Sequence, residues 1–78
     1  MDSYIFKKPA NPLEQLSNRE LEVAKLMVDG YGNAEICQAL NIQKTTVSTY
    51  KTRIFEKTGV NNLSYLIQLF NLYWKEDR

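Results

Sequence analysis

Histidine is absent from this 78-residue sequence, and cysteine occurs once, as Cys37. Without histidine the chain has neither a Cys/His zinc set nor an imidazole for acid–base catalysis, and a lone cysteine excludes an intrachain disulfide. A Gly-rich phosphate loop and paired carboxylates on one predicted face are missing as well. We therefore expect no metal, no cofactor and no enzymatic activity. Cys37 falls on the apolar side of a predicted helix, where a thiol packs well, so we interpret it as core filling rather than as a reactive group.

Long hydrophobic runs are absent too. No apolar segment approaches the roughly 18 residues that span a membrane, and the N-terminus lacks the basic, apolar and small-residue order of a signal peptide. We expect a cytoplasmic protein with no membrane partner. The composition, 44% hydrophobic and 24% charged, is that of one small globular domain. A chain of this length buries only about 60% of its unfolded surface, so its stability should be marginal.

Basic and acidic residues nearly balance, at ten against nine, for a net charge of +1. The positive charge is nevertheless concentrated between Asn41 and Val60, a segment that carries +3 and leaves −2 for the rest of the chain. That segment contains Lys44, Lys51, Arg53 and Lys57 against Glu56 alone. A local excess of cations, more than the net charge, indicates a polyanionic partner.

The same segment predicts a helix with two different faces. At about 100° per residue, one stripe is apolar and should face the core. It consists of Val47, Tyr50, Ile54 and Thr58, with Phe55 beside it. The opposite side should face outward and consists of Lys44, Thr45, Ser48, Thr49, Lys51, Thr52 and Glu56. Short hydroxyls flanked by lysines let a helix backbone approach a polyanion closely, whereas a merely solvated face more often carries Glu/Lys pairs.

Around this segment we expect a linker or arm over residues 1–15, a folded domain over 16–74 and a charged tail over 75–78. The first helix should begin at Asn18, because Ser17 and Glu20 have the spacing of a capping box, and should end before Gly30. Its predicted buried face comprises Leu21, Ala24, Leu26, Met27 and Val28.

Three further helices are predicted: residues 33–40, from 43 or 44 to 59, and from 62 or 63 to 74. The second and third are joined by a short turn, and the third presents the cationic face. This is the outline of a helix-turn-helix whose second member reads DNA. The fold class is therefore predicted to be all-α, with four helices. The last helix carries more apolar surface than the core can cover, which suggests a partner surface.

Three segments of the chain are motifs in register: LSNRELEVAKLMVDG, NAEICQALNI and TVSTYKTRIFEKTGV. Together they resemble the LuxR/FixJ-type, or GerE-like, helix-turn-helix of NarL-type response regulators and quorum-sensing regulators. Family members typically read L-T/S-x-R-E-x-E-V, G-x-S-N-K-E-I-A, T-V-K-x-H and K-L-G-V. The chain agrees at Leu16, Ser17, Arg19, Glu20, Glu22, Val23, Gly30, Asn33, Glu35, Ile36, Leu40, Ile42, Thr46, Val47, Lys57, Gly59 and Val60. It departs at Gly32, Ala34, Ser48 and Tyr50, and the last two changes affect the face that would read bases.

The resemblance implies sequence-specific binding of double-stranded DNA by a bacterial transcription regulator, with the third helix in the major groove. The residues expected to read bases are Ser48, Thr49, Lys51 and Thr52, where Lys51 can reach either a guanine edge or a phosphate. The residues expected to contact phosphate are Lys44, Thr45, Thr46, Arg53 and Lys57. The resemblance also suggests that pairing among Arg19, Glu20 and Glu35 ties the helix-turn-helix to the first helix.

The partners implied are a second copy of the chain and RNA polymerase. A homodimer on DNA would form through the last helix, with Leu63, Ile67, Phe70 and Trp74 at its seam. A protein-interaction module of the same fold that has lost DNA binding is the alternative, because Ser48 and Tyr50 depart from the usual reading residues. Two origins also stay open: the C-terminal part of a longer regulator, or a freestanding domain.

Overall fold

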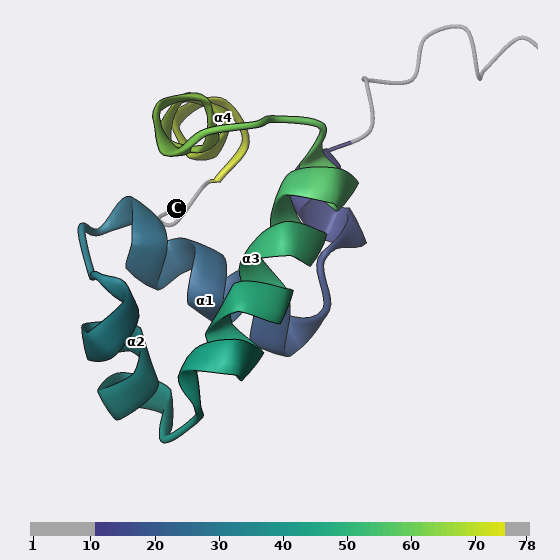
Figure 1. Cartoon of the computed structure of the whole chain (residues 1–78). Coiled ribbons are helices and arrows are strands. Elements are labelled where there is room, and N and C mark those ends of the chain that lie inside the picture. Colours follow the sequence, from purple (N-terminus) through teal and green to yellow (C-terminus); the bar gives the residue numbers. More distant parts are fainter. Residues whose placement is uncertain (1–10, 75–78) are drawn as a thin grey trace, which may run out of the picture.

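The computed structural model describes residues 11–74, which form one short 3-10 helix and four α-helices (Figure 1). In chain order they are η2 (Pro12–Gln15), α1 (Asn18–Val28), α2 (Asn33–Leu40), α3 (Lys44–Thr58) and α4 (Leu63–Tyr73). This part of the chain contains no strand, so the predicted all-α class is confirmed. None of its helices is long and apolar enough to cross a membrane. Most of the predicted arm, residues 1–10, and the predicted tail, 75–78, lie outside the described residues.

Local caps set the helix boundaries, which agree with the predicted ones to within a residue. Before α1, Ser17 Oγ accepts from the Glu20 N–H at 3.1 Å and Glu20 Oε1 accepts from the Ser17 N–H at 2.8 Å, so the capping box is confirmed. After α1, Gly30 takes a φ of 99° that few other residues tolerate. The Gly30 N–H donates to the Met27 carbonyl and the Tyr31 N–H to the Leu26 carbonyl, which is a Schellman motif.

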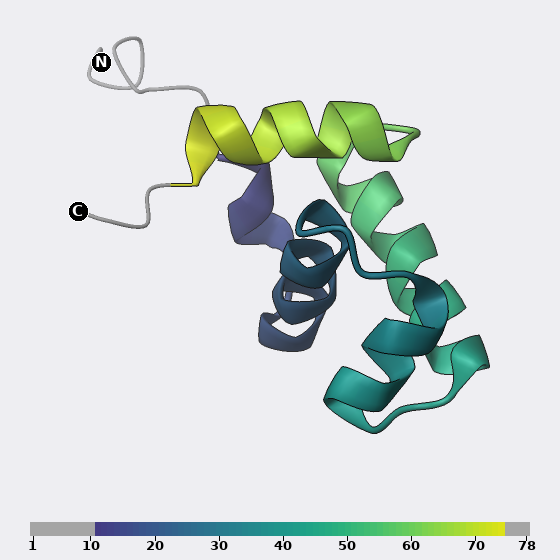
Figure 2. The same cartoon turned by 90° about the vertical axis from the view of Figure 1, so that its left-hand side faces the viewer.

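A tight turn joins α2 to α3 (Figure 2). Asn41 ends α2 in the left-handed region with a φ of 57°, and the Ile42 N–H donates to the Cys37 carbonyl at 3.0 Å. Asparagine is one of the few residues with a side chain that enters this region readily. Helix α3 begins at Lys44, directly after this turn, so the two helices form the predicted helix-turn-helix.

The core lies where α1, α3 and α4 meet, and α3 contacts α1, α2 and η2. Val47 and Ile54 of α3 are fully buried, which confirms the centre of the predicted inward stripe. The buried apolar residues are Leu13, Leu16, Val23, Ala24, Met27, Ile36, Val47, Ile54, Leu66 and Phe70. Val23 is buried although the predicted buried face of α1 does not include it, whereas the predicted Leu21, Leu26 and Val28 are only half-buried.

Helix η2 belongs to the folded domain, although the sequence predicted a linker or arm up to residue 15. Leu13 is only 3% exposed, and η2 packs against both α3 and α4. Asn11 caps it by accepting from the Leu13 N–H at 2.9 Å. A single turn is too short to show a hydrophobic period, and for that reason the pattern Pro-Leu-Glu-Gln gave no helical signal.

Replacement of Leu13 by alanine should destabilise the domain, because it leaves a cavity between η2, α3 and α4. We expect Leu13→Ala to lower the free energy of unfolding by about 2–3 kcal/mol. Leu72→Ala is the matched control, since the Leu72 side chain is 68% exposed, and it should change the free energy of unfolding by less than about 0.5 kcal/mol. Urea unfolding followed by circular dichroism measures both; equal values for the two variants would contradict the assignment of η2 to the core.

Candidate nucleic-acid interface

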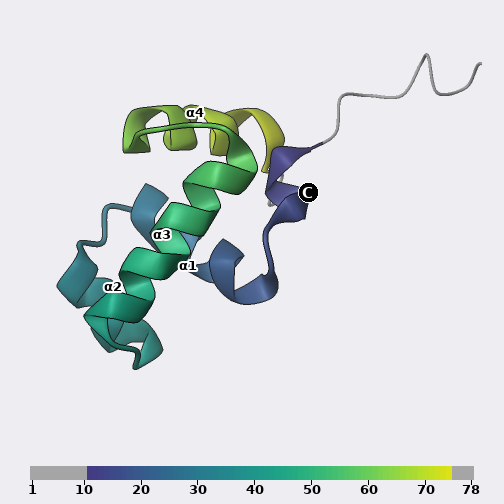
Figure 3. The ribbon, with the colours of Figure 1, turned by 45° about the vertical axis from the view of Figure 1, so that its right-hand side comes forward.

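Helix α3 runs along the outside of the molecule, with α1 behind it and α2 beside its first turns (Figure 3). Its predicted outward side is exposed at all positions but one. The exposed residues of that side are Lys44, Thr45, Ser48, Thr49, Thr52 and Glu56, and Arg53 beside them is exposed as well. Thr46 is half-buried, so it lies at the margin of this face. The structure thus gathers four hydroxyls over about two turns of α3, from Thr45 to Thr52, on one accessible surface, with Lys44 before them and Arg53 after them.

The hydroxyls on this surface are not equivalent. Thr49 Oγ1 donates to the Thr45 carbonyl at 3.0 Å, which uses its only hydrogen and leaves its oxygen as an acceptor. Ser48 and Thr52 are exposed, and their hydroxyls can rotate to donate or to accept. The surface therefore offers one fixed acceptor, Thr49, beside the two adaptable hydroxyls.

Lys51 is the exception to the exposed face, because its side chain is half-buried. Its Nζ donates to Oδ1 of Asn33, the first residue of α2, at 3.0 Å. Lys51 thus lies at the edge of α3 that adjoins α2. The sequence does not predict this contact, because a bond between residues 18 positions apart leaves no local pattern.

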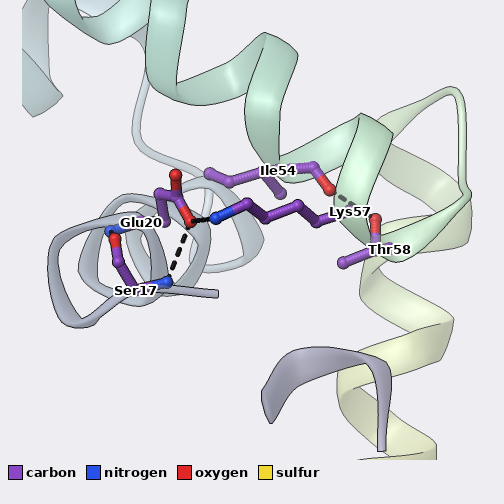
Figure 4. A network of polar contacts seen from close by, with 5 residues as sticks. All are labelled: Ser17, Glu20, Ile54, Lys57 and Thr58. Carbon is purple, nitrogen blue, oxygen red and sulfur yellow. Dashed lines mark hydrogen bonds and ion pairs between the residues drawn. The ribbon is translucent and has the colours of Figure 1, made fainter. Parts of the chain in front are cut away.

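A polar bridge between α1 and α3 involves Glu20 and Lys57 (Figure 4). Lys57 Nζ lies 2.8 Å from Glu20 Oε1, which also accepts from the Ser17 N–H. The hydrogen bonds from Lys57 and from the Ser17 backbone hold the pKa of the Glu20 carboxyl below its usual range, and they outweigh burial, which acts in the opposite direction. The ammonium of Lys57, one of the predicted phosphate contacts, is therefore directed into the domain.

The expected pairing of Arg19, Glu20 and Glu35 across helices is wrong in its partners. Arg19 instead pairs with Glu22 of the same helix, at 2.9 Å on the surface. Glu35 accepts from the Gly32 N–H at 2.7 Å and so caps the start of α2. Of these three residues, Glu20 is the one that bonds to another helix, and it does so through Lys57.

The side of α4 that is available to a partner differs from the side expected from the sequence. Phe70, one of the four predicted seam residues, is 6% exposed and belongs to the core. Trp74 stacks against Phe70 with ring centroids 5.9 Å apart, and Lys25 Nζ lies 4.9 Å from the Trp74 ring centroid. Leu63 is 41% exposed and Ile67 is half-buried, so two of the four seam residues are engaged within the domain.

A different apolar surface of α4 is open. Tyr65 and Leu72 are 53% and 68% exposed, and they lie with Leu69 at a spacing of i, i+4 and i+7 on one helix face. We call these three residues the α4 stripe. It lines a shallow hollow together with Val60 and neighbouring polar residues. The i, i+4, i+7 spacing of these residues is present in the sequence, but the sequence prediction favoured the other flank of α4, which carries Phe70 and Trp74.

The Glu20–Lys57 pair should make stability depend on pH. Because the folded-state pKa of Glu20 is lowered, its contribution is complete above the pKa of the unfolded state and is lost as pH falls through the folded value. Glu20→Gln should lower the free energy of unfolding at pH 7 by about 1–2 kcal/mol, less than for a fully buried pair because Lys57 is 39% exposed.

The difference between wild type and Glu20→Gln should shrink on acidification below about pH 4, where carboxylates protonate. Urea unfolding at pH 7, 5 and 3 measures it, and Glu22→Gln, on the exposed pair, is the control with little effect at any pH. A difference that stays constant down to pH 3 would disprove the role of the carboxylate charge.

Comparison with known proteins agrees with this arrangement. A family model described as bacterial regulatory proteins, luxR family, matches residues 14–70. The virulence-factor positive transcription regulator BvgA of Bordetella pertussis is 40% identical over 63 residues, which cover 81% of this chain and 30% of BvgA. The oxygen regulatory protein NreC of Staphylococcus aureus is 39% identical over 59 residues, 76% of this chain and 27% of NreC.

The chain thus spans less than a third of the length of these curated relatives. No solved structure gives a significant match to it. The family model covers the whole helix-turn-helix together with α1 and most of α4, and the geometry of α2, α3 and their turn fits it. This chain belongs to the luxR family of bacterial regulatory proteins, and it is a DNA-binding helix-turn-helix domain of that family.

Proposed function

We propose that the chain binds double-stranded DNA sequence-specifically, with α3 lying in the major groove. The observation that carries the proposal is the division of α3 into two faces. Val47 and Ile54 are fully buried against the rest of the domain, whereas Ser48 and Thr52 are exposed between cations. An α-helix fits the major groove of B-DNA, and short side chains allow its backbone to come close to the base edges.

Ser48, Thr49 and Thr52 face the bases in this proposal. Ser48 and Thr52 can donate to or accept from a base edge, and a threonine methyl can contact the thymine methyl. Thr49 uses its hydrogen on the Thr45 carbonyl, so it favours a base that donates, such as adenine through N6 or cytosine through N4. Lys51 approaches the duplex from the flank of α3.

The phosphate contacts lie at the ends of the same surface. Lys44 and Thr45 occupy the first turn of α3, where unpaired backbone N–H groups and the positive end of the helix dipole favour an anion. Thr46 lies at the margin of the reading face and Arg53 lies at one side of it. In this proposal both also contact phosphate. Lys57 contributes less than the sequence suggested, because its ammonium bonds Glu20.

A second copy of the chain supplies the further contacts that one small domain lacks. We place the seam on the α4 stripe, Tyr65, Leu69 and Leu72, in preference to the four residues expected from the sequence, since Phe70 and Trp74 are engaged within the domain. Two domains on adjacent half-sites double the number of phosphate contacts, which raises affinity and steepens its salt dependence.

Whether freestanding or part of a longer response regulator, the chain acts in transcription regulation in the bacterial cytoplasm in this proposal, and its relatives BvgA and NreC are named as regulators. RNA polymerase is then its protein partner, because a promoter-bound regulator acts on the enzyme that transcribes from that promoter. Retention of purified RNA polymerase on an operator duplex with and without the regulator tests this partnership, and equal retention would argue against it.

Removal of hydroxyls from the reading face should reduce discrimination between DNA sequences. We expect Ser48→Ala with Thr52→Val to weaken binding to a duplex selected from a random library by about tenfold to a hundredfold, because two lost hydroxyl hydrogen bonds of roughly 0.5–1.5 kcal/mol each sum to about 1–3 kcal/mol. Binding to a scrambled duplex should stay the same. Fluorescence anisotropy at fixed salt measures both, with Ser64→Ala as the control on an exposed serine of α4. An unchanged ratio of the two affinities would remove these residues from the reading role, and absence of binding to any duplex would favour a protein-interaction module.

A charged residue introduced into the α4 stripe should disrupt the contact between two copies of the chain on DNA. Leu72→Glu should weaken binding to a duplex with two half-sites by about tenfold or more, since the linked second contact is lost, and leave binding to a single half-site unchanged. Asn71→Glu adds the same charge to a neighbouring exposed position and should have little effect. Analytical ultracentrifugation of the complexes counts the copies per duplex; a single wild-type copy on the two-half-site duplex would exclude the dimer.

A further inference from the structure

The position of Lys51 around the axis of α3 differs from that of the reading residues. At about 100° per residue, Lys51 lies about 40° from the buried Val47 and about 60° from the buried Ile54, whereas its angles to Ser48, Thr52 and Thr49 are about 60°, 100° and 160°. Its half-buried side chain agrees with this placement. The stem of Lys51 therefore leaves α3 at the border of the core and not from the middle of the exposed face.

The ammonium of Lys51 is held at the start of α2. Its Nζ donates to Asn33 Oδ1 at 3.0 Å, which uses one of three ammonium hydrogens and leaves two for a ligand. Tyr31 to Glu35 are all exposed and the bond between Lys51 and Asn33 lies at the surface, so the first turn of α2 and this ammonium are both accessible. To reach a guanine edge, the lysine would have to break the bond to Asn33 and cross the helix surface by about a quarter of a turn.

Lys44 lies on the same flank of α3 as Lys51. The two residues are seven positions apart, which is about two turns and about 10 Å along the axis. Lys44 is exposed at the first turn of α3, next to the turn that follows α2. The flank of α3 that faces α2 thus carries a row of two cations, separate from the hydroxyls of the reading face.

We propose that Lys51 contacts a DNA phosphate and reads no base, and that Asn33 is a positioning residue that holds the Lys51 ammonium toward that phosphate. This inference rests on the proposed DNA binding and assigns the partner of one residue within it. Lys51 and Lys44 then contact the phosphates of one DNA strand along the side of α3 that faces α2. The bases face Ser48, Thr49 and Thr52. Because phosphates are the same at every step, Lys51 adds affinity and no sequence preference.

The test measures the affinity of the 78-residue chain for the selected duplex and for its scrambled counterpart over a range of salt concentrations. Lys51→Ala should weaken binding to both duplexes by the same factor, about fivefold at 0.15 M salt, and should lower the slope of log affinity against log salt by about 0.9. Asn33→Ala should also weaken binding to both duplexes, but by a smaller factor. In a chain that already carries Lys51→Ala, it should cause no further loss of affinity.

Asn33→Asp separates positioning from folding. A carboxylate at the first residue of α2 favours the helix dipole, so the unfolding midpoint should be unchanged or raised. The same carboxylate would pair with Lys51 and repel phosphate, so binding to both duplexes should weaken at least as much as in Lys51→Ala. Asn18→Asp is the matched control, because Asn18 is the exposed first residue of α1, and it should leave binding nearly unchanged.

Two results would overturn the inference while leaving the proposed function intact. One is a loss for Lys51→Ala that falls on the selected duplex alone, which would make Lys51 a base reader. The other is additivity of the Asn33→Ala and Lys51→Ala losses, which would mean that Asn33 acts independently of the lysine. If the wild-type chain binds neither duplex, the proposed function fails and this inference fails with it.

Discussion

The packing of α3 against α1 is the contact on which the rest of the molecule depends. Val47 and Ile54 of α3 are fully buried together with Val23 and Ala24 of α1, and the apolar area they remove from water is the main source of stability in so small a domain. The bond between Lys57 and Glu20 fixes the register of the two helices at one end. Since one side of α3 is committed in this way, its other side has to face outward, and the proposed DNA surface follows from the core.

Helix boundaries were the most predictable part of the structure. Local chemistry that the sequence displays directly sets the helix ends. Ser17, Glu20 and Asn62 cap helix starts, and Gly30 and Gly59 follow helix ends. The two faces of α3 were predictable for the same reason, because a 3.6-residue period is a local pattern. The resemblance to the luxR family then supplied the arrangement of the helices, which no local pattern contains.

The features that escaped prediction all depend on contacts between distant residues. The burial of Leu13 requires α3 and α4 to form its pocket, and the bond between Lys51 and Asn33 requires the turn between α2 and α3. On α4, hydrophobicity alone could not say which residues the core would take. Phe70 fills the core, and Leu72 is left exposed. Sequence therefore locates the candidate surface, whereas the structure decides which of its cations and apolar residues are available.

The turn at Asn41 has a mechanical consequence. Asparagine in the left-handed region has a higher conformational energy in the folded chain than glycine would have. It also gives the unfolded chain fewer conformations to lose on folding, and it makes the turn stiffer. With the Ile42 N–H also bonded back to the Cys37 carbonyl, the turn fixes the angle between α2 and α3. Side chains on the outer face of α3 can then be exchanged during evolution without altering that angle.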